Sequence, residues 1–362
     1  MWFAPSGVDP TYDYSFGRQN WFPYVAEEHR AAREAVALFD LSSFAKIEVT
    51  GAGALPLLQR VCTNDVDVGV GRVAYTLFLN LRGGIENDGT VTHLGTDRFL
   101  AITPTATQHR TLEWLRAEAA DMAVSVDDVT SAFATIALMG PQSRELLERL
   151  TAADLSNEGF PFFSARGIQV ASAPVLAIRA SFVGELGWEL YVPSEFAVHV
   201  YDAVVEAGPD LGLRHAGYHA LDSLRIEKGF VHVGHDVGPT DDPFSAGLGH
   251  VVKLEKDFVG AEAARRAKET PGSRRLVSLA LEDPEPILLH GESVLADGRI
   301  VGTVMSAAYA HTIGAAVGLA MVDASVVEDP DMPVQVDIAG EVVKATLSVR
   351  PLYDPSGARM RA

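Results

Sequence analysis

The stretch Arg179-Ala-Ser-Phe-Val-Gly-Glu-Leu-Gly-Trp-Glu-Leu-Tyr-Val-Pro193 predicts a β-strand that carries one acidic side chain among apolar neighbours. Because successive side chains of a strand point to opposite faces, Glu189 lies on the face opposite Trp188 and Leu190. A second acidic residue of this kind, Asp88, follows a predicted hairpin turn in Gly83-Gly-Ile-Glu-Asn-Asp-Gly-Thr-Val91. Spacing alone leaves both carboxylates open to a simpler and more common interpretation, as solvated strand residues or turn acceptors.

The rest of the chain predicts an α+β fold. Helical spacing covers residues 24–40 and 216–230, and strand patterns cover 46–50, 73–79, 85–94, 99–103 and 135–139. After a polar linker near 268–273, short β runs between 276 and 349 predict a small all-β barrel or sandwich of about 90 residues. Helices and strands do not alternate as βαβ units, which excludes a doubly wound sheet.

The composition predicts a folded protein without a disulfide framework. The 362 residues include 29 Lys+Arg and 48 Asp+Glu, which gives a formal charge of −19, and a single cysteine, Cys62. So negative a chain is a poor match to nucleic acid, because phosphates are bound by clustered Lys and Arg. The sequence shows no apolar stretch of the ~20 residues needed to cross a bilayer and no basic, apolar leader. We therefore expect a cytoplasmic protein with no nucleic-acid or membrane partner.

Two local motifs are weak matches to known signatures. Gly51-x-Gly53 follows a predicted strand, but Pro56 stands at the third glycine position of a dinucleotide fingerprint. Ser43-Phe-Ala-Lys46 matches a Ser-x-x-Lys nucleophile pattern that lacks its Ser-Asp-Asn and Lys-Thr-Gly partners. No metal site is expected, because zinc needs three or four converging ligands and the histidine pairs lie in different segments (His215 with His219, His232 with His235).

Motifs spread over nearly the whole chain carry a family resemblance by their order and spacing. They are Tyr14-Ser-Phe-Gly-Arg-Gln-Asn-Trp-Phe22, Gly71-Arg-Val-Ala-Tyr75, Leu138-Met-Gly-Pro-Gln142, Gly184-Glu-Leu-Gly-Trp-Glu189, Asp222-Ser-Leu-Arg-Ile-Glu-Lys-Gly229, Lys253-Leu-Glu-Lys-Asp-Phe-Val-Gly260 and Gly302-Thr-Val-Met-Ser-Ala-Ala-Tyr309. The chain resembles the folate-binding aminomethyltransferases, the T-protein family of the glycine cleavage system. Within that family it is most similar to the C-terminal half of dimethylglycine and sarcosine dehydrogenases.

The resemblance implies a three-lobed, disc-like α+β fold with a central folate cavity. Residues 1–50 and 135–272 would form one α+β domain that contributes to the folate pocket. Residues 51–134 would form a second α+β domain that carries Asp88, and residues 273–362 would form a C-terminal β-barrel.

The resemblance also implies roles for individual residues. Asp88 matches the family's catalytic aspartate, and Glu189 matches its pterin-binding glutamate. A single carboxylate suits that second role, because it can accept both the ring N–H and the neighbouring exocyclic amine of a pterin. Further residues implied to contact the tetrahydrofolate cofactor are Phe182, Tyr75, Arg225 and Thr103, with Arg225 as a cation for the anionic folate tail. Weaker candidates on the substrate side are Tyr309, His250 and Asn87.

Three functions are compatible with the resemblance. In the first, the protein captures a one-carbon unit from an N-methyl amine such as dimethylglycine or sarcosine and gives 5,10-methylenetetrahydrofolate, with an FAD oxidase on a separate chain as partner. In the second, it demethylates a methylated onium or ether substrate and gives 5-methyltetrahydrofolate, as the pair Asn87-Asp88 suggests by its similarity to folate-dependent demethylases. In the third, it is a non-enzymatic folate-binding protein. The first is favoured. The third is disfavoured, because non-enzymatic relatives of this kind carry a Lys-Gly-Cys-Tyr-x-Gly-Gln signature where this chain has Lys228-Gly-Phe-Val-His-Val-Gly-His235.

Overall fold

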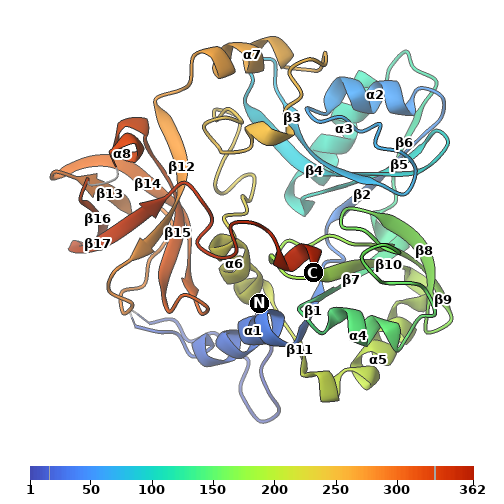
Figure 1. Cartoon of the computed structure of the whole chain (residues 1–362), viewed down its shortest axis with the longest axis horizontal. Helices are drawn as coiled ribbons and strands as arrows, with labels where there is room; N and C mark the ends of the chain where they lie inside the picture. The colour runs from blue at the N-terminus through green and yellow to red at the C-terminus, as the bar shows by residue number, and fades with distance from the viewer. Residues whose placement is uncertain (16, 330–331) are drawn as a thin grey trace.

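A computed structural model describes residues 1–15, 17–329 and 332–362; Phe16, which belongs to the first motif quoted above, lies outside the described residues. Figure 1 shows three lobes, two built on open sheets and one on a barrel. The α+β class and the C-terminal barrel expected from the sequence are confirmed.

The first lobe is built on a six-stranded sheet in the order β11-β1-β7-β10-β9-β8. Its strands are β1 (Val36–Asp40), β7 (Phe133–Met139), β8 (Ala165–Val170), β9 (Ala173–Ile178), β10 (Gly187–Pro193) and β11 (Leu213–His215). On β10, Trp188, Leu190 and Val192 join the apolar core under α4 (Ser143–Glu148) and α5 (Ala197–Ala207). Glu189 and Tyr191 therefore point away from these two helices, as the alternation predicts.

The second lobe is built on a five-stranded sheet in the order β3-β4-β5-β2-β6. Its strands are β2 (Ala45–Thr50), β3 (Val73–Leu79), β4 (Ile85–Gly95), β5 (Arg98–Thr103) and β6 (Ser125–Asp128). One face packs on α2 (Ala54–Val61) and α3 (Gln108–Glu118) through a core that includes Ile47, Val91 and Phe99. The strand β2 pairs with β5 and β6, so residues 45–50 belong to the second sheet. This differs from the expectation that residues 1–50 belong to the other α+β domain.

The two sheets pack on each other through their helix-free faces. Val73, Leu100 and Ile102 of the second sheet share an apolar cluster with Ile178 and Tyr191 of the first. Burial of these side chains fixes the orientation of the two lobes. In both sheets, the strand residues whose side chains point away from the helices are thus brought to a common interface.

The third lobe is a closed barrel in the order β12-β15-β14-β13-β16-β17. Its strands are β12 (Arg274–Leu281), β13 (Ser293–Ala296), β14 (Arg299–Ala310), β15 (Ala315–Asp323), β16 (Val334–Ile338) and β17 (Glu341–Ser348), with α8 (Ala324–Glu328) after β15. The helix α7 (Ala261–Glu269) precedes the barrel in the chain.

Two helices, α1 (Phe22–Glu34) and α6 (Tyr218–Glu227), pack together, and α6 also contacts β14 of the barrel. The helix expected over residues 24–40 is wrong at its C-terminal end. Residues 36–40 form β1, which pairs with β7 and β11. The continuous apolar run Val36-Ala-Leu-Phe39 is buried, as is usual for a central strand.

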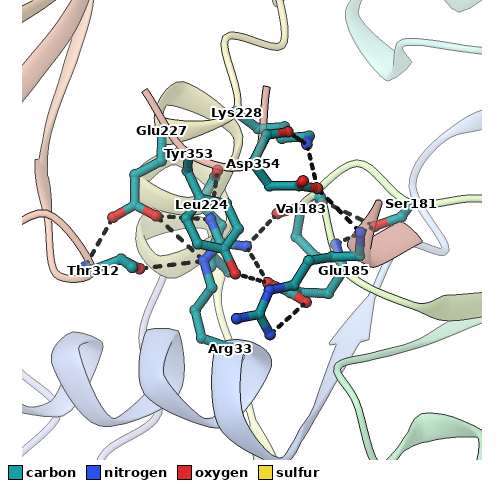
Figure 2. A network of polar contacts seen from close by, with 12 residues as sticks. Arg33, Ser181, Val183, Glu185, Leu224, Glu227, Lys228, Thr312, Tyr353 and Asp354 are labelled. Atoms are coloured by element: carbon teal, nitrogen blue, oxygen red, sulfur yellow. Dashed lines mark hydrogen bonds and ion pairs between the residues drawn. The ribbon is translucent and has the colours of Figure 1, made fainter. Parts of the chain in front are cut away.

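A buried polar network around Arg33 of α1 joins parts of the chain that are distant in sequence (Figure 2). The Arg33 guanidinium donates to Glu227 Oε2 of α6 at 2.8 Å and to Glu185 Oε1, before β10, at 3.2 Å. It also lies over the ring of Tyr353 from the C-terminal segment, 3.9 Å from the centroid. Glu227 Oε1 in turn accepts the backbone N–H of Thr312, in the hairpin between β14 and β15, at 2.9 Å. This network therefore links the first lobe, α6, the barrel and the C-terminal segment.

Across residues 1–15, 17–329 and 332–362, no helix has both the length and the apolar character needed to span a membrane.

Candidate active site

Asp88 lies on β4 and is held by Tyr75 from the neighbouring strand β3. The Tyr75 hydroxyl donates to Asp88 Oδ2 at 2.9 Å, and no other residue of the described chain donates a side-chain hydrogen bond to this carboxylate. Burial raises the pKa of Asp88 to about 6, against the opposing effect of the Tyr75 hydrogen bond. Burial likewise raises the pKa of Tyr75, so that the phenol stays a donor. Asp88 is thus a half-buried carboxylate that can change its protonation near neutral pH.

Glu189 lies on β10 in an arrangement of the same kind. The Tyr191 hydroxyl, two residues along the strand and on the same face, donates to Glu189 Oε2 at 2.7 Å. Trp188 and Leu190 are fully buried, whereas Glu189 keeps partial exposure. Burial raises the pKa of Glu189, and the Tyr191 hydrogen bond and the charge of Lys46 act against that rise. Within the described chain, no side chain donates to Oε1, which leaves this oxygen available as an acceptor.

Strand register places both carboxylates at the interface of the two lobes. On β4 and β5, Thr90 pairs with Ile102, so Asp88, two residues from Thr90, lies on the same sheet face as Ile102. Ile102 belongs to the apolar cluster that contains Tyr191 of β10. Asp88 and the Glu189–Tyr191 pair are therefore on the two sheet faces that meet, and both carboxylates retain access to solvent.

Lys46 joins this face from β2. It pairs with Ile102 of β5 and is fully buried. Its ammonium donates to the carbonyl oxygens of Ser42 and Phe44 at 3.0 and 2.9 Å. Burial lowers the pKa of Lys46 to about 8, against the opposing charges of Glu189, Asp40 and Asp128.

Asn87 and Thr103 lie on the opposite face of the second sheet from Asp88. Asn87 donates through Nδ2 to Thr111 Oγ1 of α3 at 2.8 Å and is buried. A Cβ placed on Gly89 would meet Thr103 Cγ2 at 3.0 Å, so Thr103 shares the face of Asn87 and Gly89. The structure does not bring either side chain to the Asp88 carboxylate.

Arg225 of α6 is engaged inside the protein. Its guanidinium donates to Asp236 Oδ2 at 2.5 Å, to Asp222 Oδ1 at 3.1 Å and to Ser306 Oγ of β14 at 2.9 Å. A further hydrogen bond reaches the carbonyl oxygen of Phe230. The side chain is buried and its charge is paired with two carboxylates, so the guanidinium is not free to meet an anionic tail in this arrangement.

The structure places the three remaining predicted residues, Phe182, Tyr309 and His250, in different surroundings. Phe182 stacks on Phe230 with ring centroids 6.1 Å apart. Tyr309, near the end of β14, packs against Phe22 of α1 with centroids 5.0 Å apart. His250 is exposed in a 3-10 turn over Gly249–Val251.

Sequence reasoning missed two residues of the site, Tyr191 and Lys46. Tyr191 could have been found from alternation, because it lies two residues after Glu189 in the same strand. Lys46 gave no such signal, because its position beside Ile102 depends on the pairing of two strands more than 50 residues apart.

Two family models match the chain. The GCVT N-terminal domain matches residues 1–256, and the glycine cleavage T-protein C-terminal barrel domain matches residues 274–354. The second match coincides with the closed barrel.

Curated relatives align with nearly the whole of this chain. It is 50% identical over 99% of its length to a 4-methylaminobutanoate oxidase (formaldehyde-forming) of Paenarthrobacter nicotinovorans, covering 44% of that protein. It is 34% identical over 99% of its length to the mitochondrial dimethylglycine dehydrogenase of Homo sapiens, covering 42%. An aminomethyltransferase of Geobacillus thermodenitrificans is 37% identical over 92% of this chain and 91% of its own. The chain thus spans less than half the length of the first two relatives.

Among solved structures, the glycine cleavage system aminomethyltransferase T of Bartonella henselae superposes with a TM-score of 0.84. The match covers 95% of this chain and 94% of that one, at 23% identity. At this identity the match concerns the fold alone.

Proposed function

This chain belongs to the glycine cleavage T-protein family, and on that premise we propose that it is a tetrahydrofolate-dependent one-carbon transferase. Its substrate class would be an N-methyl amine whose one-carbon unit is captured as 5,10-methylenetetrahydrofolate. The observation that supports this proposal most directly is the placement of two tyrosine-held carboxylates, Asp88 and Glu189, on the sheet faces that meet.

Glu189 is suited to bind the pterin. Its Oε2 is already held by Tyr191, while Oε1 is free to accept hydrogen bonds from a ligand. Two N–H donors side by side on the pterin match a single carboxylate, and such charge-assisted bonds are about twice as strong as neutral ones. Partial exposure within an otherwise buried strand gives the ligand access to this group.

Asp88 is suited to proton transfer. Tetrahydrofolate supplies the nitrogens that accept the one-carbon unit, and closing the carbon onto them requires a proton to be taken up and given back. A carboxyl group with a pKa of about 6 can do both near neutral pH. Tyr75 fixes its orientation through the 2.9 Å hydrogen bond.

The N-methyl amine class is inferred from two relatives, which are named for 4-methylaminobutanoate and dimethylglycine. Removing two electrons from an N-methyl group needs an oxidant, which we assign to a flavin oxidase unit. That unit would lie either on a separate chain or on a segment that corresponds to the part of the longer relatives not covered by this chain. The alternative, direct demethylation to 5-methyltetrahydrofolate, is suggested by the pair Asn87-Asp88 and needs no oxidase. Asn87 points to α3, so the geometry gives this alternative no specific support.

Product analysis tests the proposal. The protein is incubated with tetrahydrofolate, an N-methyl amino acid and a flavin oxidase that acts on it, and in parallel with a panel of methylated onium and ether substrates without oxidase. Free formaldehyde condenses with tetrahydrofolate unaided, so the rate without protein is the baseline. Methylenetetrahydrofolate formed above that baseline is expected. Methyltetrahydrofolate from the panel would identify a demethylase, and bound folate with neither product would identify a non-enzymatic folate-binding protein.

A further inference from the structure

Lys46 is a fully buried lysine that the proposed chemistry does not use. Two of its three N–H groups donate to the carbonyl oxygens of Ser42 and Phe44. Among the residues that the structure describes, no acceptor takes the third. A buried ammonium with an uncommitted donor is costly unless an opposite charge lies close by.

Among the carboxylates whose charge acts on Lys46, Glu189 of the first lobe has the largest effect, and it lies on the sheet face that packs against the face of Lys46. Cross-strand partners share a face, so Lys46 lies beside Ile102, and Ile102 shares an apolar cluster with Tyr191. Phe44, which accepts a hydrogen bond from Lys46, packs on this cluster and also on the one that includes Phe182. Lys46 and the Glu189–Tyr191 pair thus lie on the two sheet faces that meet at this cluster.

We propose that Lys46 is a positioning residue for Glu189, whose charge together with the Tyr191 hydroxyl keeps Glu189 ionised and thereby sets the lower pH limit of pterin binding. This inference rests on the proposed function, in which Glu189 binds the pterin. Lys46 touches neither cofactor nor substrate in this assignment and acts only through the carboxylate.

The electrostatics agree with this role. Burial favours the neutral form of Glu189, while the charge of Lys46 and the hydrogen bond from Tyr191 favour the ionised form. Glu189 in turn helps to keep Lys46 protonated, with Asp40 of β1 and Asp128 of β6 as the other carboxylates that act on it. Only the ionised form of Glu189 can accept hydrogen bonds at every oxygen, so a ligand that offers two donors needs it.

The test is the affinity for 5-formyltetrahydrofolate, a stable reduced folate, measured by calorimetry from pH 5 to pH 8. Lys46→Gln keeps amide donors for the two carbonyls but removes the charge. We expect the acid limb of binding, the fall in affinity toward low pH, to shift upward by about one pH unit, so that affinity falls up to about tenfold at the acid end of the range and less at pH 8. Lys46→Arg keeps the charge and should keep both within about twofold.

A matched control is Lys256, another lysine whose ammonium donates to two backbone carbonyls, those of Cys62 and Asn64. Lys256→Gln should leave the pH profile of binding unchanged, whatever it does to the melting temperature. Tyr191→Phe removes one hydroxyl and should shift the acid limb in the same direction as Lys46→Gln, which keeps the inference testable if the lysine variant does not fold.

A double-mutant cycle separates this inference from the proposed function. In a Glu189→Gln background, Lys46→Gln should have no further effect on affinity, because the charge it supports is gone. If Lys46→Gln leaves the pH profile of an otherwise Glu189-dependent binding reaction unchanged, the inference is wrong while the proposed function stands. If Glu189→Gln itself leaves affinity unchanged, the pterin assignment fails first.

Discussion

The hydroxyl of Tyr75 on β3 donates a hydrogen bond to Oδ2 of Asp88 on β4, 2.9 Å away. This contact fixes one carboxylate oxygen, and within the described residues no side chain donates to the other. It also opposes the effect of burial on the carboxyl group, whose pKa is nevertheless raised to about 6. Reactivity of Asp88 therefore depends on a balance between desolvation and a single neighbouring phenol.

Replacing Asp88 by Asn should lower kcat by about 10²–10⁴-fold, the usual contribution of a positioned acid or base. Affinity for 5-formyltetrahydrofolate should change little, because the pterin is assigned to Glu189. Burial disfavours the charged form of Asp88, so the neutral amide should not lower the melting temperature. Full activity in a folded Asp88→Asn variant would remove Asp88 from the chemistry.

Replacing Tyr75 by Phe should move the pH dependence of kcat. The Tyr75 hydrogen bond stabilises the ionised carboxylate and so lowers the pKa of Asp88. Its loss raises that pKa, and the limb of the pH–rate profile that has its midpoint near pH 6 in the native protein should move to higher pH. Rates measured from pH 5 to pH 8.5 check this, with Asp88→Asn as the variant in which the limb is absent. An unmoved limb would show that another group controls it.

Local patterns singled out the two carboxylates, the family resemblance suggested their roles, and pairing between distant strands decided which residues lie near them. Strand alternation put Glu189 opposite Trp188, and the structure agrees. The same rule, applied to Asn87, would have separated it from Asp88. The mistaken helical end at 36–40 arose because a continuous apolar run fits a buried helix and a central strand equally well. For Arg225, the partner that neutralises it, Asp236, lies in a loop whose course no local pattern reveals.

Replacing Glu189 by Gln should weaken binding of 5-formyltetrahydrofolate by about 10- to 100-fold at pH 7, since hydrogen bonds to a charged group contribute about 1.5–3 kcal/mol. The amide keeps the shape of the side chain but offers one acceptor oxygen and an NH₂ that repels the ligand's donors. Calorimetric titration of the native and variant proteins measures the change. A conservative control is Glu48→Gln, a partly exposed carboxylate of β2 that is already paired with Arg98, which should bind as the native protein does.

Replacing Arg33 by Met should destabilise the fold by about 3–5 kcal/mol, because Glu185 and Glu227 would remain buried without their cation. Although burial alone would raise it, contacts with His29 and Arg33 lower the pKa of Glu227 to about 2. The native pair therefore contributes stability that is present above about pH 4.5 and is lost as the pH falls toward 2. Urea denaturation at pH 7 and pH 3 measures both effects.

The double variant Arg33→Met with Glu227→Gln is the control for this network. Removing both charges should recover part of the loss at pH 7, because an unpaired buried carboxylate costs more than a neutral amide. Equal stability of the single and double variants would show that Glu227 does not depend on Arg33.

Replacing Arg225 by Met should lower stability and leave recognition of the folate tail unchanged. The guanidinium holds Asp236, Asp222 and Ser306 together, so its loss leaves the fully buried Asp236 carboxylate without a cation. We expect a loss of about 3–5 kcal/mol in the free energy of unfolding. The second variant, Arg225→Met with Asp236→Asn, should recover part of it, and any folded variant can then be tested for binding.

The binding readout for Arg225 compares folates that carry one and several glutamates in their tails. If Arg225 served the anionic tail, its loss would weaken binding of the longer-tailed folate more than that of the shorter one, and the difference would shrink at high salt because exposed charges are screened. With the guanidinium neutralised by two carboxylates, the ratio of the two affinities should instead stay within about twofold of the native ratio. A selective loss for the longer tail would return Arg225 to the binding site and overturn its structural assignment.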